Sequence, residues 1–104
     1  MSPGETMWFA EDGDTRFTVA AECPGRCSRA TFAADARASI DTDVASWDQP
    51  AAGSTSEVLR VEDRPDGLAV LWKSGGAAFP ERLHADVLWW AAGTPAIVRC
   101  SLET

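Results

Sequence analysis

The sequence lacks any apolar run approaching the roughly 18 residues that a membrane-spanning helix needs. It also lacks, near Met1, the basic segment and following apolar segment that mark a secretory signal. We therefore expect a cytoplasmic protein. Because that compartment is reducing, we expect its cysteines to remain thiols.

Basic residues are scarce, with 9 Lys and Arg against 16 Asp and Glu, and the formal net charge is −7. Binding of phosphate groups needs a basic stripe, which a chain of this balance does not supply. Nucleic acid and anionic membrane are therefore excluded as expected partners. The negative charge remains compatible with binding to another protein, a basic one included, or to a cationic small molecule. It also favours solubility.

Motifs of common catalytic and cofactor sites are missing. No nucleophile elbow is present, and Gly75-Gly76 is not followed by the Lys-Ser/Thr of a phosphate loop. The acidic clusters at 11–14 and 41–43 lack the ligand ladder of a calcium loop. We expect no cofactor, and no motif identifies a family.

The three cysteines allow one metal-site hypothesis. Cys23 and Cys27 flank a Pro-Gly-Arg turn, and Cys100 with His84, the only histidine, would complete a Cys3His zinc set. The last two are isolated positions rather than a second pair, so we expect no metal. A disulfide between Cys23 and Cys27 is the alternative, and the reducing compartment disfavours it.

Alternating apolar and polar residues dominate what is present. At 104 residues the chain predicts one β-rich domain, 1–104. The alternation predicts strands, and the intervening Gly, Pro and Asp predict turns. The predicted strands are 16–23, 57–63, 68–73, 83–91 and 96–102, with a further short strand near 6–11.

These strands form three predicted hairpins, at 6–23, 57–73 and 83–102. The expected fold is therefore mainly β, an antiparallel sandwich or small open barrel of about six to seven strands. The segment 28–47 is open to two interpretations. We expect an extended start at 28–34 and one short helix near 35–46, where apolar residues recur at helical spacing: Phe32, Ala36, Ile40, Val44 and Trp47.

The hairpin 83–102 holds the best candidate site. Leu83, Ala85, Val87, Trp89 and Ala91 share one wholly apolar strand face, which predicts that Trp89 lies in the core. The opposite face grades from polar to apolar, which is typical of a pocket or interface. The predicted binding residues are on that face: Trp90, Leu88, His84 and Asp86.

His84 and Asp86 are also the only candidates for catalysis. They lie two apart on one strand, so the carboxylate could orient the imidazole as a general base. The simpler interpretation is that both are solvated residues near a strand end.

Three functions remain compatible with these patterns, and the sequence does not establish whether the protein is an enzyme. The favoured one is a small acidic, non-enzymatic protein-binding module of inhibitor, immunity or accessory-subunit type, with Trp anchors on 83–102. These patterns are also compatible with a homodimer. The alternatives are a small-molecule-binding β-barrel protein and a small enzyme, each with a pocket near His84, Asp86 and Trp90.

Overall fold

A computed structural model describes residues 5–22, 28–91 and 96–104. The described chain forms six strands and one α-helix with two short 3-10 turns. The strands are β1 (Glu5–Asp12), β2 (Thr15–Glu22), β3 (Thr55–Arg64), β4 (Gly67–Gly75), β5 (Arg82–Ala91) and β6 (Ala96–Glu103). The helix α1 spans Phe32–Trp47.

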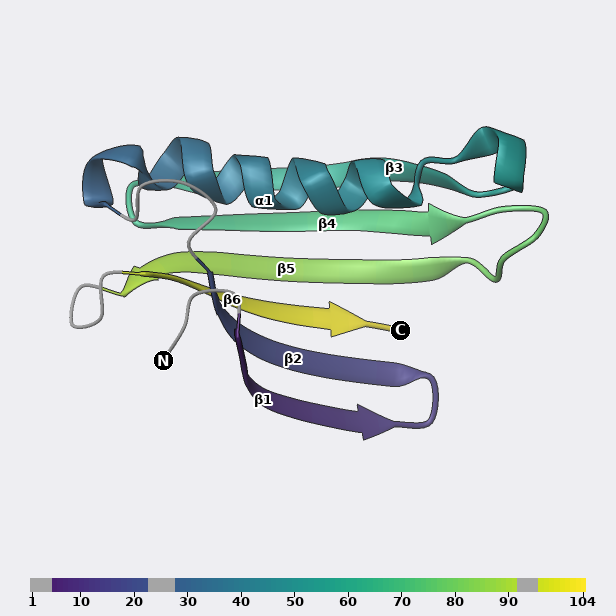
Figure 1. Ribbon diagram of the computed structural model, residues 1–104, viewed down its shortest axis with the longest axis horizontal. Helices are drawn as coiled ribbons and strands as arrows, with labels where there is room; N and C mark the ends of the chain where they lie inside the picture. The colour runs from purple at the N-terminus through teal and green to yellow at the C-terminus, as the bar shows by residue number, and fades with distance from the viewer. Residues whose placement is uncertain (1–4, 23–27, 92–95) are drawn as a thin grey trace.

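All six strands join one open antiparallel sheet in the order β1-β2-β6-β5-β4-β3. The prediction of a mainly β, antiparallel fold with one helix is confirmed. The second layer is the helix rather than a second sheet or a closed barrel wall, and it lies along β3 and β4 (Figure 1). The β1–β2 hairpin joins the rest of the sheet through β6 and lies beyond the helix.

The helix begins earlier than its composition suggested. The extended conformation predicted for 28–34 is wrong, because a 3-10 turn at Arg29–Thr31 leads directly into α1. Ser28 starts this turn, and its side-chain oxygen accepts a hydrogen bond from the Thr31 N–H. A polar cap of this kind satisfies an otherwise unpaired donor and so lets helical structure begin there.

The predicted helical stripe is confirmed as the inner face of α1. Phe32, Ala36 and Ile40 are buried, and Val44 and Trp47 pack against the same core. The sheet contributes apolar side chains from its central strands: Leu68, Val70, Trp72, Leu88 and Ile97, with Val58, Val61 and Trp90 at the margin. One core therefore lies between α1 and a single face of the sheet.

Two backbone features shape the β3–β4 end of the sheet. The register of β3 shifts between Val58 and Arg60, so Leu59 is an extra residue and both Val58 and Val61 reach the core. Gly75 has φ +130, and an added Cβ would stand 2.6 Å from the Cα of Glu81. Only glycine allows this close approach of the chain as it leaves β4.

The predicted Pro-Gly-Arg turn at 24–26 lies outside the described residues, as do Cys23, Cys27 and the residues 92–95 that join the last two strands. Among the residues that the structure describes, no helix is both long enough and apolar enough to cross a bilayer.

Candidate functional site

The face of β5 that carries His84, Asp86, Leu88 and Trp90 points toward the helix, which reverses the expected assignment of its two faces. Leu88 is fully buried and Trp90 packs against the core. The prediction that Trp89 lies in the core and Trp90 at the surface is therefore wrong. Trp89 is 38% exposed on the opposite face. The inversion arises because the polar residues of the inner face find partners beneath the helix.

Asp86 is the centre of those partners. Its carboxylate is 2% exposed and accepts hydrogen bonds from Trp72 Nε1 at 2.7 Å, Arg99 Nε at 3.0 Å and the Ser101 hydroxyl. The three donors come from β4 and β6, the strands on either side of β5. A buried charge is tolerated only when it is paired and hydrogen-bonded in this way.

Arg99 extends this network to the helix. Besides Asp86, its guanidinium contacts Asp43 Oδ2 at 2.6 Å and donates to Ser39 Oγ at 3.2 Å, both on α1. The planar guanidinium has five donors, so it can serve all three acceptors at once. The Asp86–Arg99 pair thus fixes β5, β6 and α1 relative to one another.

His84 contacts Ser74 and Trp72. Its Nε2 lies 2.7 Å from Ser74 Oγ, and its ring stacks on Trp72 with centroids 3.8 Å apart and planes 8° from parallel. Desolvation by burial lowers the pKa of His84, although Glu103 and Asp86 act to raise it. His84 and Asp86 therefore share a face, as predicted, and both contact Trp72, which donates a hydrogen bond to Asp86 and stacks on the ring of His84.

A small polar cavity of about 190 Å³ opens beside this network. It is lined by residues of the sheet and of the end of α1: Thr18, Asp43, Trp47, Trp72, His84, Asp86, Arg99, Ser101, Leu102 and Glu103. The predicted residues His84 and Asp86 line it, whereas Leu88 and Trp90 do not. Its volume is below the roughly 300–1,000 Å³ usual for small-molecule pockets.

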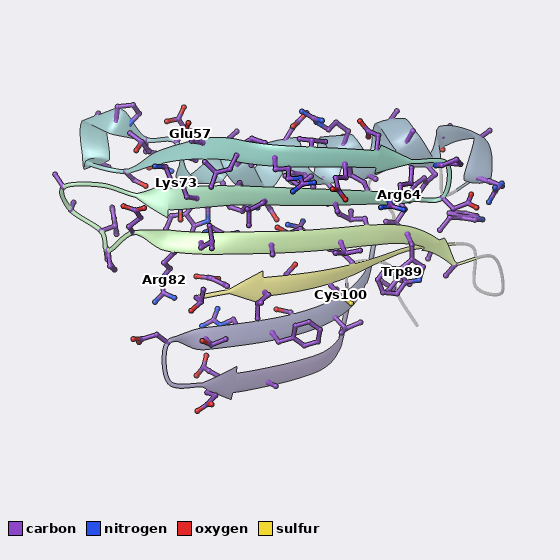
Figure 2. The ribbon with its side chains drawn as sticks, turned by 180° about the vertical axis from the view of Figure 1, so that it is seen from behind. Glu57, Arg64, Lys73, Arg82, Trp89 and Cys100 are labelled. Atoms are coloured by element: carbon purple, nitrogen blue, oxygen red, sulfur yellow. The ribbon has the colours of Figure 1, made fainter. Side chains whose placement is uncertain are left out.

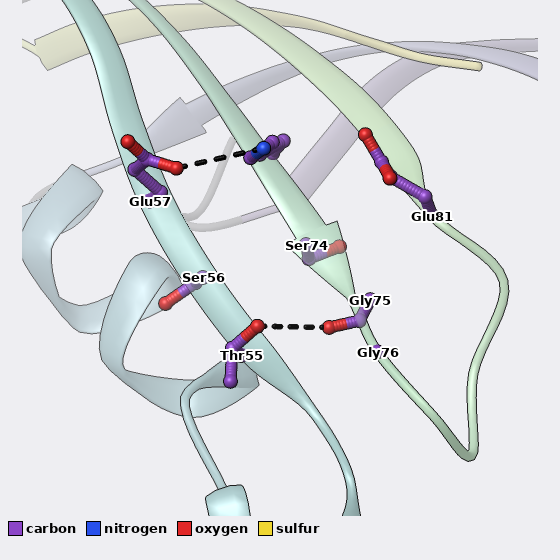
Figure 3. Close-up of a pocket in the computed structure, with 8 residues that line it drawn as sticks. Thr55, Ser56, Glu57, Ser74, Gly75, Gly76 and Glu81 are labelled. Carbon is purple, nitrogen blue, oxygen red and sulfur yellow. Dashed lines mark hydrogen bonds and ion pairs between the residues drawn. The ribbon is translucent and has the colours of Figure 1, made fainter.

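A larger cavity of about 430 Å³ lies where β3 and β4 meet the loop before β5 (Figure 3). Glu57 and Glu81 reach toward it from β3 and from that loop. Several of its polar groups pair with one another: Lys73 pairs with Glu57 at 3.5 Å, and Thr55 Oγ1 donates to the Gly75 carbonyl at 3.1 Å. The sequence pattern gave no signal for this cavity, because it forms where two strand ends and a loop converge.

The metal-site hypothesis does not fit the sheet. Val87 pairs with Cys100 and lies on the face opposite to His84, so Cys100 and His84 point to opposite sides of the sheet. They cannot share one ion. Within the described ranges, no group of three or more acidic, His or Cys side chains is placed to hold a metal.

The face of the sheet that α1 does not cover is a further candidate site, and we call it the open face (Figure 2). Four of its side chains are large, apolar and exposed: Leu83, Val87, Trp89 and Leu102. Strand register places them beside further apolar residues: Phe17, Val19, Leu71, Val98 and Cys100. Large contiguous apolar areas are uncommon on the surfaces of monomeric proteins, which makes the open face a candidate interaction site.

Comparison with known proteins adds no functional information, because no protein-family model, curated protein or solved structure matches the chain.

Proposed function

We propose that this protein is a small, non-enzymatic protein-binding module and that the open face is its interface. The observation that carries the proposal is the apolar area centred on β5 and β6, of which Val87 is 47% exposed and Trp89 38% exposed. A few side chains carry most of the binding energy at a protein interface, and tryptophan is enriched among them, near the apolar centre of the interface.

The candidate catalytic residues His84 and Asp86 make contacts within the protein. Asp86 has three donors and His84 is bonded to Ser74. A general base must reach the proton of the substrate, and Ser74, His84 and Asp86 are all buried, with at most 6% of each exposed. Both side chains already stabilise the layer between sheet and helix, which supports a binding role for the protein over a catalytic one.

The anchor in this proposal is Trp89 rather than Trp90. Trp89 lies on the same face as Val87 and next to Val98 of β6. An anchoring Trp can contribute about 2 kcal/mol or more to affinity, provided that water is excluded around it. The surrounding Leu and Val side chains supply that exclusion once a partner covers them.

Site-specific photo-crosslinking in the cells that produce the protein tests the proposal. A photoreactive amino acid at Val87 should give discrete covalent protein products, and Trp89→Asp in the same chain should abolish them. The matched position is Ala38, which is exposed on the outer side of α1. Absence of products from Val87, or the same products from Ala38, would contradict the proposal. The mass of each product distinguishes a second copy of the chain from another protein.

A further inference from the structure

The charged side chains of the open face follow a pattern that points to a specific partner. On this face β3 carries four charges, in the order Glu57, Arg60, Glu62 and Arg64, whereas Asp63 is on the side of the core residue Leu68. Their partners on β4 are Lys73, Leu71, Ala69 and Gly67. Those partners are two residues apart at every step, so the bulge at Leu59 leaves the charges evenly spaced.

The pattern along β3 is therefore acid, base, acid, base. Reversing its direction gives base, acid, base, acid, which is its electrostatic complement. A second β3 that packs over the first in the antiparallel direction would place Glu57 opposite Arg64 and Arg60 opposite Glu62. Each pair would occur twice in the dimer. A two-fold axis that lies parallel to the sheet and perpendicular to the strands produces this arrangement. The two copies then use the same surface, which defines an isologous dimer.

We infer that the partner of the open face is a second copy of this chain, packed face to face about such an axis. This inference rests on the proposed function and names its partner. The axis crosses β3 between Arg60 and Glu62, at the level where Val61 pairs with Val70. Continued along the register, it crosses β5 at Asp86 and β6 at Ser101, so it bisects the apolar area.

The same axis brings the apolar side chains together. Leu83 and Trp89 lie three residues to either side of Asp86, so Trp89 of each copy would cover Leu83 of the other. A shallow groove of about 240 Å³ lies beside the axis, lined on this face by Arg60, Glu62, Ala69, Leu71, Ala85 and Val87. Its small alanines leave room for side chains of the second copy.

The distribution of charge also favours a second copy. Over β2–β6 the open face carries three basic and two acidic side chains, although the chain as a whole has a net charge of −7. The excess negative charge therefore lies elsewhere. Two copies can approach through this face without bringing their acidic surfaces together, whereas a strongly charged partner would find no complement on it.

The open face is large enough for a stable dimer. Five strands at about 4.8 Å spacing and eight residues at about 3.4 Å give a footprint of roughly 650 Å². Side chains that project from the sheet increase the accessible area above that footprint. Standard interfaces bury about 800 Å² on each partner.

Charge-reversal variants and sedimentation velocity test the inference. An acidic-rim variant, Arg60→Glu with Arg64→Glu, leaves four acids on the open face of β3, and a basic-rim variant, Glu57→Lys with Glu62→Lys, leaves four bases there. All four side chains are at least 40% exposed, so folding should survive and circular dichroism will check it. We expect the wild-type chain to be dimeric and each variant to self-associate roughly 100-fold more weakly.

Mixing the two variants is the decisive step, because the four acids on β3 of one variant would face the four bases on β3 of the other in the heterodimer. We expect the equimolar mixture to recover the dimer. The matched control, Arg29→Glu with Arg37→Glu, makes the same charge change on exposed arginines outside the open face and should remain dimeric.

Three results would overturn the inference: a monomeric wild-type chain at millimolar concentration, a dimeric acidic-rim variant, or a mixture that stays monomeric. If the wild-type chain is monomeric while the photoreactive group at Val87 still captures a different protein, the inference fails and the proposed function stands.

Discussion

Replacing Asp86 by alanine tests whether the buried polar network holds the sheet and helix together. The substitution removes the carboxylate from three donors and leaves Arg99, which is only 7% exposed, without one of its two carboxylate partners. Breaking a buried ion pair from one side costs about 3–5 kcal/mol. Asp43 still contacts Arg99, which reduces this cost, whereas Trp72 Nε1 loses its acceptor, which adds about 1–3 kcal/mol.

We therefore expect Asp86→Ala to lower the free energy of unfolding by about 4 kcal/mol, a large part of the ~5–15 kcal/mol typical of a whole domain. In urea denaturation this would move the midpoint by roughly 2–4 M. Asp86→Asn, which keeps the shape and one acceptor but removes the charge, should lie between the wild type and the alanine variant.

The matched control is Asp41→Ala on α1. This carboxylate is exposed and pairs with Arg37 four residues away, so its loss should cost about 0.5 kcal/mol or less. If Asp86→Ala were no more destabilising than Asp41→Ala, the network would not be what orients β5 and the helix, and the explanation for the inverted faces of β5 would be wrong.

Three further predictions concern His84, the two tryptophans and the glycines. Burial lowers the pKa of His84, so stability should be full above about pH 6.5, its unfolded pKa, and should fall below it by at most ~1.4 kcal/mol per pH unit. Unfolding of the wild type and of His84→Gln from pH 7.0 to 5.5 measures this, and an unchanged slope in the variant would contradict it. Trp90→Ala should be clearly more destabilising than Trp89→Ala in chemical denaturation, because only Trp90 packs against the core; equal losses would refute the burial argument. Gly75→Ala should lower the melting temperature more than Gly13→Ala, since both glycines have positive φ but only at Gly75 would a Cβ meet neighbouring backbone; similar shifts would argue against that close approach.

The positions of the strands could be predicted from the sequence because local alternation and turn residues determine them. All five principal strands lie within about two residues of their expected bounds. The helical stripe from Phe32 to Trp47 was equally readable, since its period is a local property. The start of the helix was not, because it depends on the short turn capped by Ser28.

Which face of β5 is buried could not be read locally. The apolar row from Leu83 to Ala91 is typical of a core face, yet it is the open one. The polar row is buried because Asp86 finds donors 13 to 15 residues away along the chain, at Arg99, Trp72 and Ser101. An apolar strand face indicates that another surface packs against it. Only the tertiary structure shows whether that surface belongs to the same chain.

The pairing of β2 with β6 has a consequence for the order of assembly. Thr18 lies opposite Ser101, so strands from the first and last parts of the sequence pair inside the sheet. The other strand pairs and the helix form from segments that are close in sequence, and such contacts form faster. During synthesis the β1–β2 hairpin emerges first but gains its neighbour only when β6 has left the ribosome. We therefore expect this hairpin to dock last and, in the native state, to be the first unit whose amides exchange with solvent.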